Sequence, residues 1–599
     1  MSGAGFDLAI IVVYFVVIIG IGLYAARGQK TMETYALGNR SMPWWAVLAS
    51  ILASEISAGT FLGTPSEGYA KLNFLYAQLV IGTIIARLLV AAVFIKPFYD
   101  LKVVSIYEFL EIRFGRVTRR ISSFVFLLTR SLASGSRIFV AAILLVLAWE
   151  VMHPEFRQLD PEARFQQELF IYIGAVVVLT FLTALYTTLG GIKAVVWTDL
   201  IQVSLMFGSA IYVFFWLLGK TGGWDGFVSS IKPSAADFNS YVTSGIDSSK
   251  SFGENLKGIF SQEYTIWAAF FGSVFTTLAT HGTDQDMVQR MLTSQDHKKG
   301  QRSVIVSGLI DLPVVIGFLA IGILLYRFYA QNPDRAPDHD PGIFAWFMVH
   351  DLAPGLRGLL AAGLFATAMG SLSTALNALA TTFTKDWYVG YFRPQATSHE
   401  QFKAARWATV AFAVFLALIG IGTAFIKLKN PDLRLIPIVL GSFGYTYGSL
   451  LGVFLIGMLT KTRGNCRGNV IAMIAGLLVV CFFSSAHNDV YDIFHDKEAK
   501  VRKALVTLKV APSYSTFAAG FEPPTPEILA QVVEKTKLPE NEVLALWTSR
   551  TSHEPWFLPS WMPVFAFTWR IMLGTLVTVA VGLCFRRKGA AYVAQPLPA

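Results

Sequence analysis

Charged residues are scarce in this 599-residue chain, at 15% of the total, and cysteines are scarcer still, at three. A soluble protein of this length needs far more charge to cover its surface, so the composition excludes that class. Cys466, Cys481 and Cys584 show no CxxC or Cys/His spacing, which argues against a disulfide framework or a zinc site. No P-loop, nucleophile elbow or HExxH motif occurs, so the sequence does not predict an enzyme.

The chain is rich in apolar residues. Hydrophobic residues make up 54% of the chain, and its mean hydropathy is +0.53. Thirteen apolar runs are long enough to cross a hydrocarbon core of ~30 Å, which predicts an all-α polytopic membrane protein with 13 transmembrane helices. The runs cover residues 5–26, 43–66, 72–98, 122–151, 168–188, 192–219, 264–284, 303–328, 357–386, 403–424, 434–460, 467–484 and 560–585.

The net charge of +10 arises from Lys and Arg in short loops, which is the positive-inside pattern and not a sign of a nucleic-acid partner. Every odd-numbered run is followed by basic residues; Arg290, Lys298, Lys299 and Arg302, for example, follow the seventh. The pattern predicts an outer N-terminus and a cytoplasmic C-terminus, in a plasma membrane or bacterial inner membrane. Residues 1–7 lack a basic n-region, so the first run is expected to be a retained span.

The central spans form two blocks of five, residues 43–219 and 264–460, and an odd number of spans inverts the second block relative to the first. Each block opens on an interrupted helix, at residues 54–59 and at residues 276–282. The remaining segments are an extra N-terminal helix with an inner loop (1–42), an outer loop (220–263), a twelfth span (461–486), an outer insertion (487–558), and a last span with an inner tail (559–599).

Two short helices are predicted within the outer insertion. Thr525 and Pro526 are typical of an N-cap and a first-turn proline, and Pro539 is expected to open a second helix. The insertion carries no recognisable chemistry, and we interpret it as a cap or an interaction surface.

The first interruption contains a carboxylate, Glu55, together with Ser54, Ser57, Gly59 and Thr60. A carboxylate at membrane depth is costly, so it normally faces a cavity or a partner and marks an ion or substrate pathway. Helices broken at the midplane also form the binding sites of many secondary transporters. The sequence therefore predicts a protein that moves a solute across a membrane.

Hydroxyl side chains gather in residues 366–377, where positions 367, 370, 371 and 374 share one helical face. Sodium is a hard cation that is satisfied by several oxygen ligands, and hydroxyls of this kind can supply them. The alternative is close helix packing, which small residues also mediate in membranes.

Further charges fall inside predicted spans, and structural ion pairs are the alternative to a binding role for each. They are Arg87, Arg130, Arg137, Asp199 and Asp311. Arg130 and Arg137 are seven residues apart on one face and could pair with acids or hold an anionic substrate. Asp199, near the inner end of its span, could attract a departing cation. His281 lies in the second interruption and could bind substrate, carry a proton, or be structural.

These features resemble the sodium/solute symporter family over nearly all of residues 5–480. The stretches that carry the resemblance are 53–65, 105–114, 190–202 and 282–290. The run Leu62-Gly63-Thr64-Pro65-Ser66-Glu67, followed by Tyr69, is similar to the branch that transports monocarboxylates, iodide and multivitamins with sodium.

The resemblance implies a leucine-transporter-like bundle with a 5+5 inverted repeat that works by alternating access. It also implies a sodium site made of Ala53, Ile56, Thr367, Gly370 and Ser371. Gly370 departs from the family pattern because it has no hydroxyl. Glu55 matches an aspartate implicated in sodium binding in the proline-transporter branch, and Asp199 matches the aspartate on the sodium exit path.

The family's sugar pocket does not carry over, because its asparagine, gating tyrosine and lysine correspond to Thr277, Thr280 and Asp311. Asp311 beside Thr277 and His281 suggests a polar or zwitterionic ligand, and an anion would need Arg137 or Arg130 to offset the acids. The residues expected to line the substrate pocket are Ser57, Gly59, Thr60, Thr277, Thr280, His281 and Asp311.

The sequence therefore predicts a sodium-coupled symporter in a lipid bilayer that takes up a small polar organic solute, with Na+ as the coupling ion. Two alternatives remain open. Proton coupling would use Glu55, Asp311 or His281, with Gly370 marking a decayed sodium site. A transporter-like sensor would use the outer insertion to signal occupancy to a partner.

Overall fold

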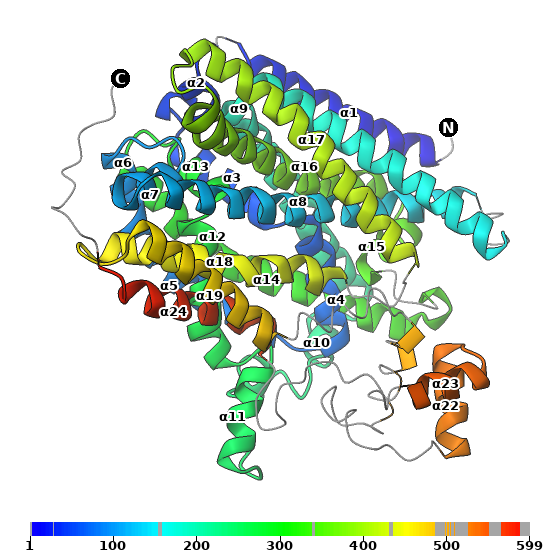
Figure 1. Ribbon diagram of the computed structural model, residues 1–599. Coiled ribbons are helices and arrows are strands. Elements are labelled where there is room, and N and C mark those ends of the chain that lie inside the picture. The colour runs from blue at the N-terminus through cyan, green and yellow to red at the C-terminus, as the bar shows by residue number, and fades with distance from the viewer. Residues whose placement is uncertain are drawn as a thin grey trace.

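The protein is a bundle of helices in the computed structural model (Figure 1). The structure describes residues 3–27, 29–153, 159–337, 342–429, 435–484, 497–498, 500–501, 504, 508, 525–549 and 565–586. Within these ranges every regular element is a helix, accompanied by two isolated β-bridges, Met42 with Ser294 and Arg463 with Arg586.

The principal helices are α1 (Gly3–Ala25), α3 (Trp44–Glu55), α4 (Ala58–Lys71), α5 (Leu79–Val90), α8 (Arg116–Met152), α9 (Pro161–Lys220), α12 (Val274–Gly282), α13 (Gln285–Met291), α14 (His297–Gln331), α16 (Leu356–Thr382), α17 (Ser398–Lys429), α18 (Leu435–Leu459), α19 (Cys466–Phe483) and α24 (Phe567–Leu583). The shorter helices are α2 (Met32–Leu37), α6 (Lys96–Asp100), α7 (Tyr107–Phe114), α10 (Gly223–Val228), α11 (Phe252–Ser261), α15 (Ile343–His350), α22 (Pro526–Thr536) and α23 (Glu540–Ser549). The π-helical segments are η3 (Ala91–Ile95), η6 (Ala268–Ser273) and η8 (Phe383–Phe392), and the 3-10 turns are η1 (Gly38–Arg40), η2 (Leu75–Gln78), η5 (Phe238–Ser240) and η7 (Pro333–Arg335).

The outer surface of the bundle is apolar, as a lipid environment requires. On α17 the side chains of Trp407 and Leu418 are 75% and 60% exposed, and on α1 Val16 is 64% exposed. Contiguous apolar exposure of this kind is rare on proteins that face water. Eight helices of the described residues are long and apolar enough to cross a membrane, or nine if α3 and α4 count as one bent span.

Helix α9 is much longer than one membrane crossing. Its 60 residues correspond to about 90 Å of helix, roughly three times the thickness of a hydrocarbon core. The backbone changes direction at Gly191, which has φ +49° and ψ −152°. Only glycine adopts this conformation without strain, so Gly191 divides α9 into two helical segments.

The first predicted interruption is present. Helices α3 and α4 meet at an angle of 63°, and Ile56 between them has non-helical φ and ψ of −82° and 83°. The second was predicted in the wrong place, because residues 276–282 are helical and the chain leaves the helix at Thr283 and Asp284 instead. Hydroxyls alone do not break a helix: Thr280 donates to the carbonyl of Thr276 at 3.1 Å within α12.

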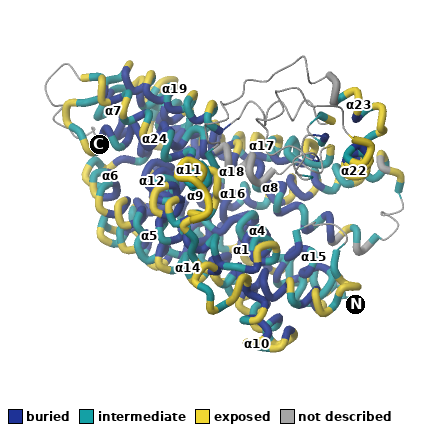
Figure 2. The backbone as a smooth tube through the Cα atoms, turned by 90° about the horizontal axis from the view of Figure 1, so that it is seen from below, coloured by how far each residue is buried: buried dark blue, intermediate teal, exposed yellow. Residues whose placement is uncertain are grey.

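The polar segments predicted outside the spans also contain helices. Helix α11, in the loop of residues 220–263, has no buried residue; half of its residues are exposed and the others are half-buried (Figure 2). In the insertion, Thr525 caps α22 by accepting from the N–H of Ile528, and α23 begins directly after Pro539, so both predicted helices are confirmed. Val532 and Val543 bury their side chains in a small core shared by these two helices.

The two ends of the bundle are built from different elements. Helices α6, α7 and α13 gather at one end, and α15 lies at the other (Figure 1). Between them, α3 packs against α9, α14 and α16, and α8 packs against α16, α17 and α18. Both helix breaks therefore lie among packed helices and not at the lipid-facing surface.

We expect Gly191→Ala to lower the free energy of unfolding by about 1–3 kcal/mol, because a side chain at positive φ is strained. A Cβ there would also lie 2.6 Å from the carbonyl oxygen of Tyr35. Thermal unfolding in detergent measures the effect. Gly208→Ala, in the same helix with no neighbouring atom within 4 Å, is the matched control and should not destabilise. Equal melting temperatures for the two variants would contradict the role of Gly191.

Candidate functional site

The break between α3 and α4 frees backbone carbonyls inside the bundle. In a continuous helix the N–H of Ser57 would donate to Ala53, but here it donates to Glu55 at 3.0 Å. The carbonyls of Ala53 and Ile56 consequently receive no backbone hydrogen bond from the described residues. Both residues are buried, at 3% exposure. An unpaired carbonyl at this depth is costly unless another group satisfies it, and a cation does so.

Helix α16 presents the predicted hydroxyl face to this break. Thr367 and Ser371 are buried, and their hydroxyls donate to the carbonyls of Leu364 at 2.7 Å and Ala368 at 3.1 Å. A hydroxyl that donates its proton to its own helix keeps its lone pairs for a cation. A Cβ at Gly370 would lie 3.4 Å from the Ala53 carbonyl oxygen. The five residues predicted for a sodium site therefore lie on two packed helices, α3 and α16, around the break.

Asp199 on α9 reaches the same region. Its side chain is fully buried, and its Oδ2 accepts a hydrogen bond of 2.5 Å from the Ser50 hydroxyl on α3. Its second oxygen, Oδ1, has no hydrogen-bond partner in the part of the chain that the structure describes, and would lie 3.5 Å from a Cβ at Gly370. The carboxylate thus adds negative charge beside the residues of the predicted sodium site.

Glu55 lies in a cluster of charged side chains from four helices. Arg87 of α5 contacts Oε1 of Glu55, and Nε2 of His281 on α12 lies 2.8 Å from the same oxygen. Arg87 also lies 3.6 Å from Asp311 of α14 and donates to Ser307 at 2.8 Å. The side chains of Glu55 and Asp311 keep 14% and 19% exposure, so the cluster is not completely enclosed.

The other predicted pocket residues line the two broken helices. Ser57 is the N-cap residue of α4, but its hydroxyl makes no capping hydrogen bond. Gly59 and Thr60 follow in the first turn of the helix. The first N–H groups of a helix lack intrahelical partners and attract negative charge. On α12, Thr277 donates to Thr83 at 3.3 Å and Thr280 contacts Nδ1 of His281 at 3.0 Å. Each predicted pocket residue is therefore on α4, α12 or α14.

A second buried network lies at the other break. Arg130 of α8 contacts Asp286 and pairs with Asp284 at 3.0 Å, and Arg290 pairs with Asp286 at 3.2 Å. Arg290 also donates to the Ser50 carbonyl at 2.8 Å, which joins α13 to α3. Arg290 was expected in an inner loop, but it is fully buried. The expectation failed because Asp286 and Arg290, four residues apart, neutralise each other within one short helix.

Arg137, two turns after Arg130 on α8, has a different environment. Its guanidinium stacks on the ring of Phe443 at 5.3 Å, a ring that Arg130 also approaches at 5.9 Å. In the described part of the chain no carboxylate or carbonyl accepts from Arg137, and its buried Nε has no partner. Both arginines were predicted either to pair with acids or to hold an anion. Arg130 pairs with two aspartates, whereas Arg137 has no acidic partner among the described residues and is available to an anion.

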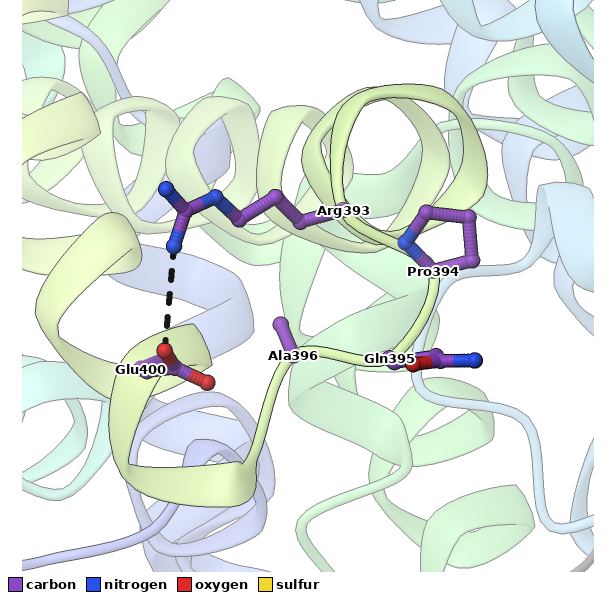
Figure 3. A pocket seen from close by; sticks show the side chains of 5 residues that line it. All are labelled: Arg393, Pro394, Gln395, Ala396 and Glu400. Atoms are coloured by element: carbon purple, nitrogen blue, oxygen red, sulfur yellow. Dashed lines mark ion pairs between the residues drawn. The ribbon is translucent and has the colours of Figure 1, made fainter.

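A surface cavity of about 420 Å³ lies elsewhere. Its walls are Arg393, Pro394, Gln395, Ala396 and Glu400, with Arg393 and Glu400 3.8 Å apart (Figure 3). Arg393 follows Ser371 by 22 residues of nearly continuous helix, or about 33 Å. This cavity is therefore separate from the helix breaks.

The bundle has two broken helices, with unpaired carbonyls at one break and opposed charges beside them. These features are typical of secondary transporters. The sequence profile described as the Sodium:solute symporter family matches residues 35–152 and 162–476. The chain belongs to this family, as its motifs indicated.

Curated relatives agree with the assignment. The chain is 27% identical to a sodium/sialic acid symporter of Proteus mirabilis, over 79% of this chain and 88% of the relative. It is 27% identical to the human sodium-coupled monocarboxylate transporter 1, over 79% and 72% of the two chains. A sodium-dependent multivitamin transporter of Oryctolagus cuniculus is 29% identical, over 79% and 69%.

The fold also matches a solved structure, the substrate-bound outward-open state of a Na+-coupled sialic acid symporter. The TM-score is 0.68 with 97% of each chain covered, at 23% sequence identity. The protein is thus a sodium-coupled symporter that takes up a small solute, and it is not an enzyme.

Arg87→Gln should lower the free energy of unfolding by about 3–5 kcal/mol, because it leaves Glu55 and Asp311 buried without their cation. Adding Glu55→Gln should recover part of the loss. Arg116→Gln is the control, since the Arg116–Glu111 pair is exposed and such pairs contribute less than about 1 kcal/mol. Thermal unfolding in detergent compares the variants, and a similar small loss for both arginines would sink the assignment.

Proposed function

We propose that this symporter imports a small organic solute that carries a carboxylate, and that Arg137 binds the carboxylate. The observation that carries the proposal is the free guanidinium of Arg137 inside the membrane. An arginine in a transmembrane segment is costly and normally finds a partner or marks a pathway. Arg87, Arg130 and Arg290 all have acidic partners, and Arg137 has none among the described residues.

A carboxylate is the ligand that suits these donors best. Guanidinium and carboxylate form short, charge-assisted pairs that can be bidentate. The names of the relatives do not decide the point, because one relative, from Vibrio parahaemolyticus, is named for glucose, whereas others are named for sialic acid and monocarboxylates. Arg137 favours the acidic substrates over the neutral sugar.

Polar groups on the broken helices would hold the rest of the solute. Helix α8, which carries Arg137, packs against α4, whose first turn contains Ser57, Gly59 and Thr60. Thr277, Thr280 and His281 on α12, with Asp311 on α14, would bind hydroxyl or amide groups. Because Arg87 contacts Glu55 and lies 3.6 Å from Asp311, it offsets part of the negative charge that these acids would present to an anionic solute.

The coupling sodium would bind between the two helices that meet at the first break. We assign as ligands the carbonyls of Ala53, Ile56 and Thr367 and the hydroxyl of Ser371, with Gly370 beside them. The unpaired carbonyls of Ala53 and Ile56 and the free lone pairs of the Ser371 hydroxyl support this assignment. Asp199 would receive the ion on its way to the cytoplasm.

The topology completes the proposal. If α9 counts as two spans, α3 with α4 as one, and η6 with α12 as one, the chain would have 13 spans, with two inverted blocks at 43–219 and 264–460. The basic loops predict an outer N-terminus. Sodium would order α3 against α16, solute would follow, and rocking of the bundle would open the inner side. Each charge that crosses 100 mV contributes about 2.3 kcal/mol.

Ser371→Ala should raise the sodium concentration for half-maximal uptake by about tenfold, because it removes a ligand at a site that needs several oxygens. Uptake titrated with sodium in proteoliposomes measures the shift. Ser204→Ala is the control, since the Ser204 hydroxyl also donates to its own helix but is exposed on the outside of α9. Unchanged sodium dependence in a well-expressed Ser371→Ala variant would refute the site.

Arg137→Ala should weaken binding of the carboxylate solute by about 10-fold to 100-fold, the size of a lost hydrogen bond to a charged group. Arg137→Lys should recover part of this loss, because it keeps the charge but not the fork of donors. Thermal stabilisation by acids and by their matching amides, in sodium, identifies the solute and measures its affinity. Equal stabilisation by an acid and its amide would contradict the proposal.

A further inference from the structure

We propose that Gln202 supplies the sodium ligand that position 370 lacks, an inference that rests on the proposed sodium site. The sodium face of α16 contains a hydroxyl at Ser371 but only a hydrogen atom at Gly370. Gln202 of α9 is 1% exposed and occupies the neighbouring space. Gln202 ends the stretch of residues 190–202 that resembles the family, but the sequence by itself predicts no role for it.

The oxygens around the missing side chain are close together. A Cβ at position 370 would lie 2.9 Å from Oε1 of Gln202, 3.4 Å from the carbonyl oxygen of Ala53 and 3.5 Å from Oδ1 of Asp199. Three oxygen atoms from α3 and α9 thus surround one point on α16. Oxygen atoms are the ligands that hard cations prefer.

Two of these oxygens have no hydrogen-bond donor. Oε1 of Gln202 and Oδ1 of Asp199 are both buried, and no donor among the described residues reaches either atom. Buried polar atoms are nearly always paired, and an unpaired one costs free energy. If Gln202 only filled the space beside Gly370, its amide oxygen would be expected to find a donor. A cation satisfies both oxygens and offsets the charge of Asp199.

Each of these two oxygens is oriented by a hydrogen bond that the other polar atom of the same side chain makes. The Gln202 Nε2 donates to the hydroxyl of Tyr14 on α1 at 3.4 Å, which turns Oε1 toward α16. Asp199 accepts from Ser50 through Oδ2, which leaves Oδ1 toward Gly370. Helix α1 lies outside the two predicted repeats, so through Tyr14 it positions a ligand for the central site.

The test compares the purified protein in sodium and in potassium without solute. Selective binding of sodium to the folded state raises its melting temperature. Gln202→Ala should shift the sodium concentration that gives half of this stabilisation by about tenfold. Gln202→Glu keeps an oxygen at the site and should retain the sodium response. Ser209→Ala, two turns further along α9 and equally buried, is the matched control and should behave as wild type.

A second hydroxyl distinguishes a ligand from a packing residue. Gly370→Ser alone should gain no sodium affinity, because its Cβ at 2.9 Å would displace the oxygen of Gln202. In the Gln202→Ala background the same serine has room, and its hydroxyl should restore the sodium response. The effect of Gly370→Ser on sodium affinity would therefore depend on whether Gln202 is present. Such a dependence is expected of neighbouring residues that share a role.

The outcomes separate the two proposals. If wild type shows no sodium-dependent stabilisation, the proposed sodium site itself fails. If wild type responds, Ser371→Ala is impaired and Gln202→Ala responds as wild type, only the role of Gln202 is overturned. If Gln202→Ala does not fold, loss of the sodium response in Gln202→Glu overturns the proposal, and its retention supports it.

Discussion

An interrupted helix inside a membrane leaves backbone carbonyls that neither water nor the helix can satisfy, and the structure is organised around this constraint. The interruption at Ile56 frees the carbonyls of Ala53 and Ile56. The hydroxyl face of α16 and the carboxylate of Asp199 lie beside them. A cation can be coordinated by all of these oxygen atoms at once. In the sodium site that we propose, ion binding and the packing of α3 against α16 would be one event, which is how an ion gradient can drive a conformational change.

Paired charges stabilise the two breaks from opposite sides. At the first, Arg87 joins Glu55 of α3 to Asp311 of α14. At the second, Arg130 and Arg290 hold the two aspartates of α13, and Arg290 also bonds to α3. The networks tie together elements that are far apart in the chain. Against this background of paired side chains, Arg137 is an arginine with no carboxylate or carbonyl acceptor among the described residues, and our choice of substrate class depends on it.

The features that the sequence predicted correctly are those with a local physical cause. The break at residues 54–59 was predictable, because a carboxylate and a glycine in an apolar run are both unfavourable in a buried continuous helix. The second break was misplaced, because Thr276 and Thr280 satisfy their hydroxyls within the helix and do not interrupt it. Arg290 was assigned to a loop, because a cluster of basic residues follows it and its partner Asp286 was not recognised. The sodium ligands that we propose were named from the family resemblance, whereas spacing alone indicated only the hydroxyl face of residues 367–374.

The sequence by itself determined the class of protein, because hydropathy and the distribution of basic residues act over whole segments and do not depend on how the helices pack. It also determined the family, through short motifs that survive at 27% identity. Only the tertiary structure decided which charges are paired and which are free. Arg130 and Arg137 share one face of one helix, yet one meets two aspartates and the other an aromatic ring. That difference is set by α13 and α18, which follow the two arginines by more than 140 residues in the chain and contact their side chains only in the folded bundle.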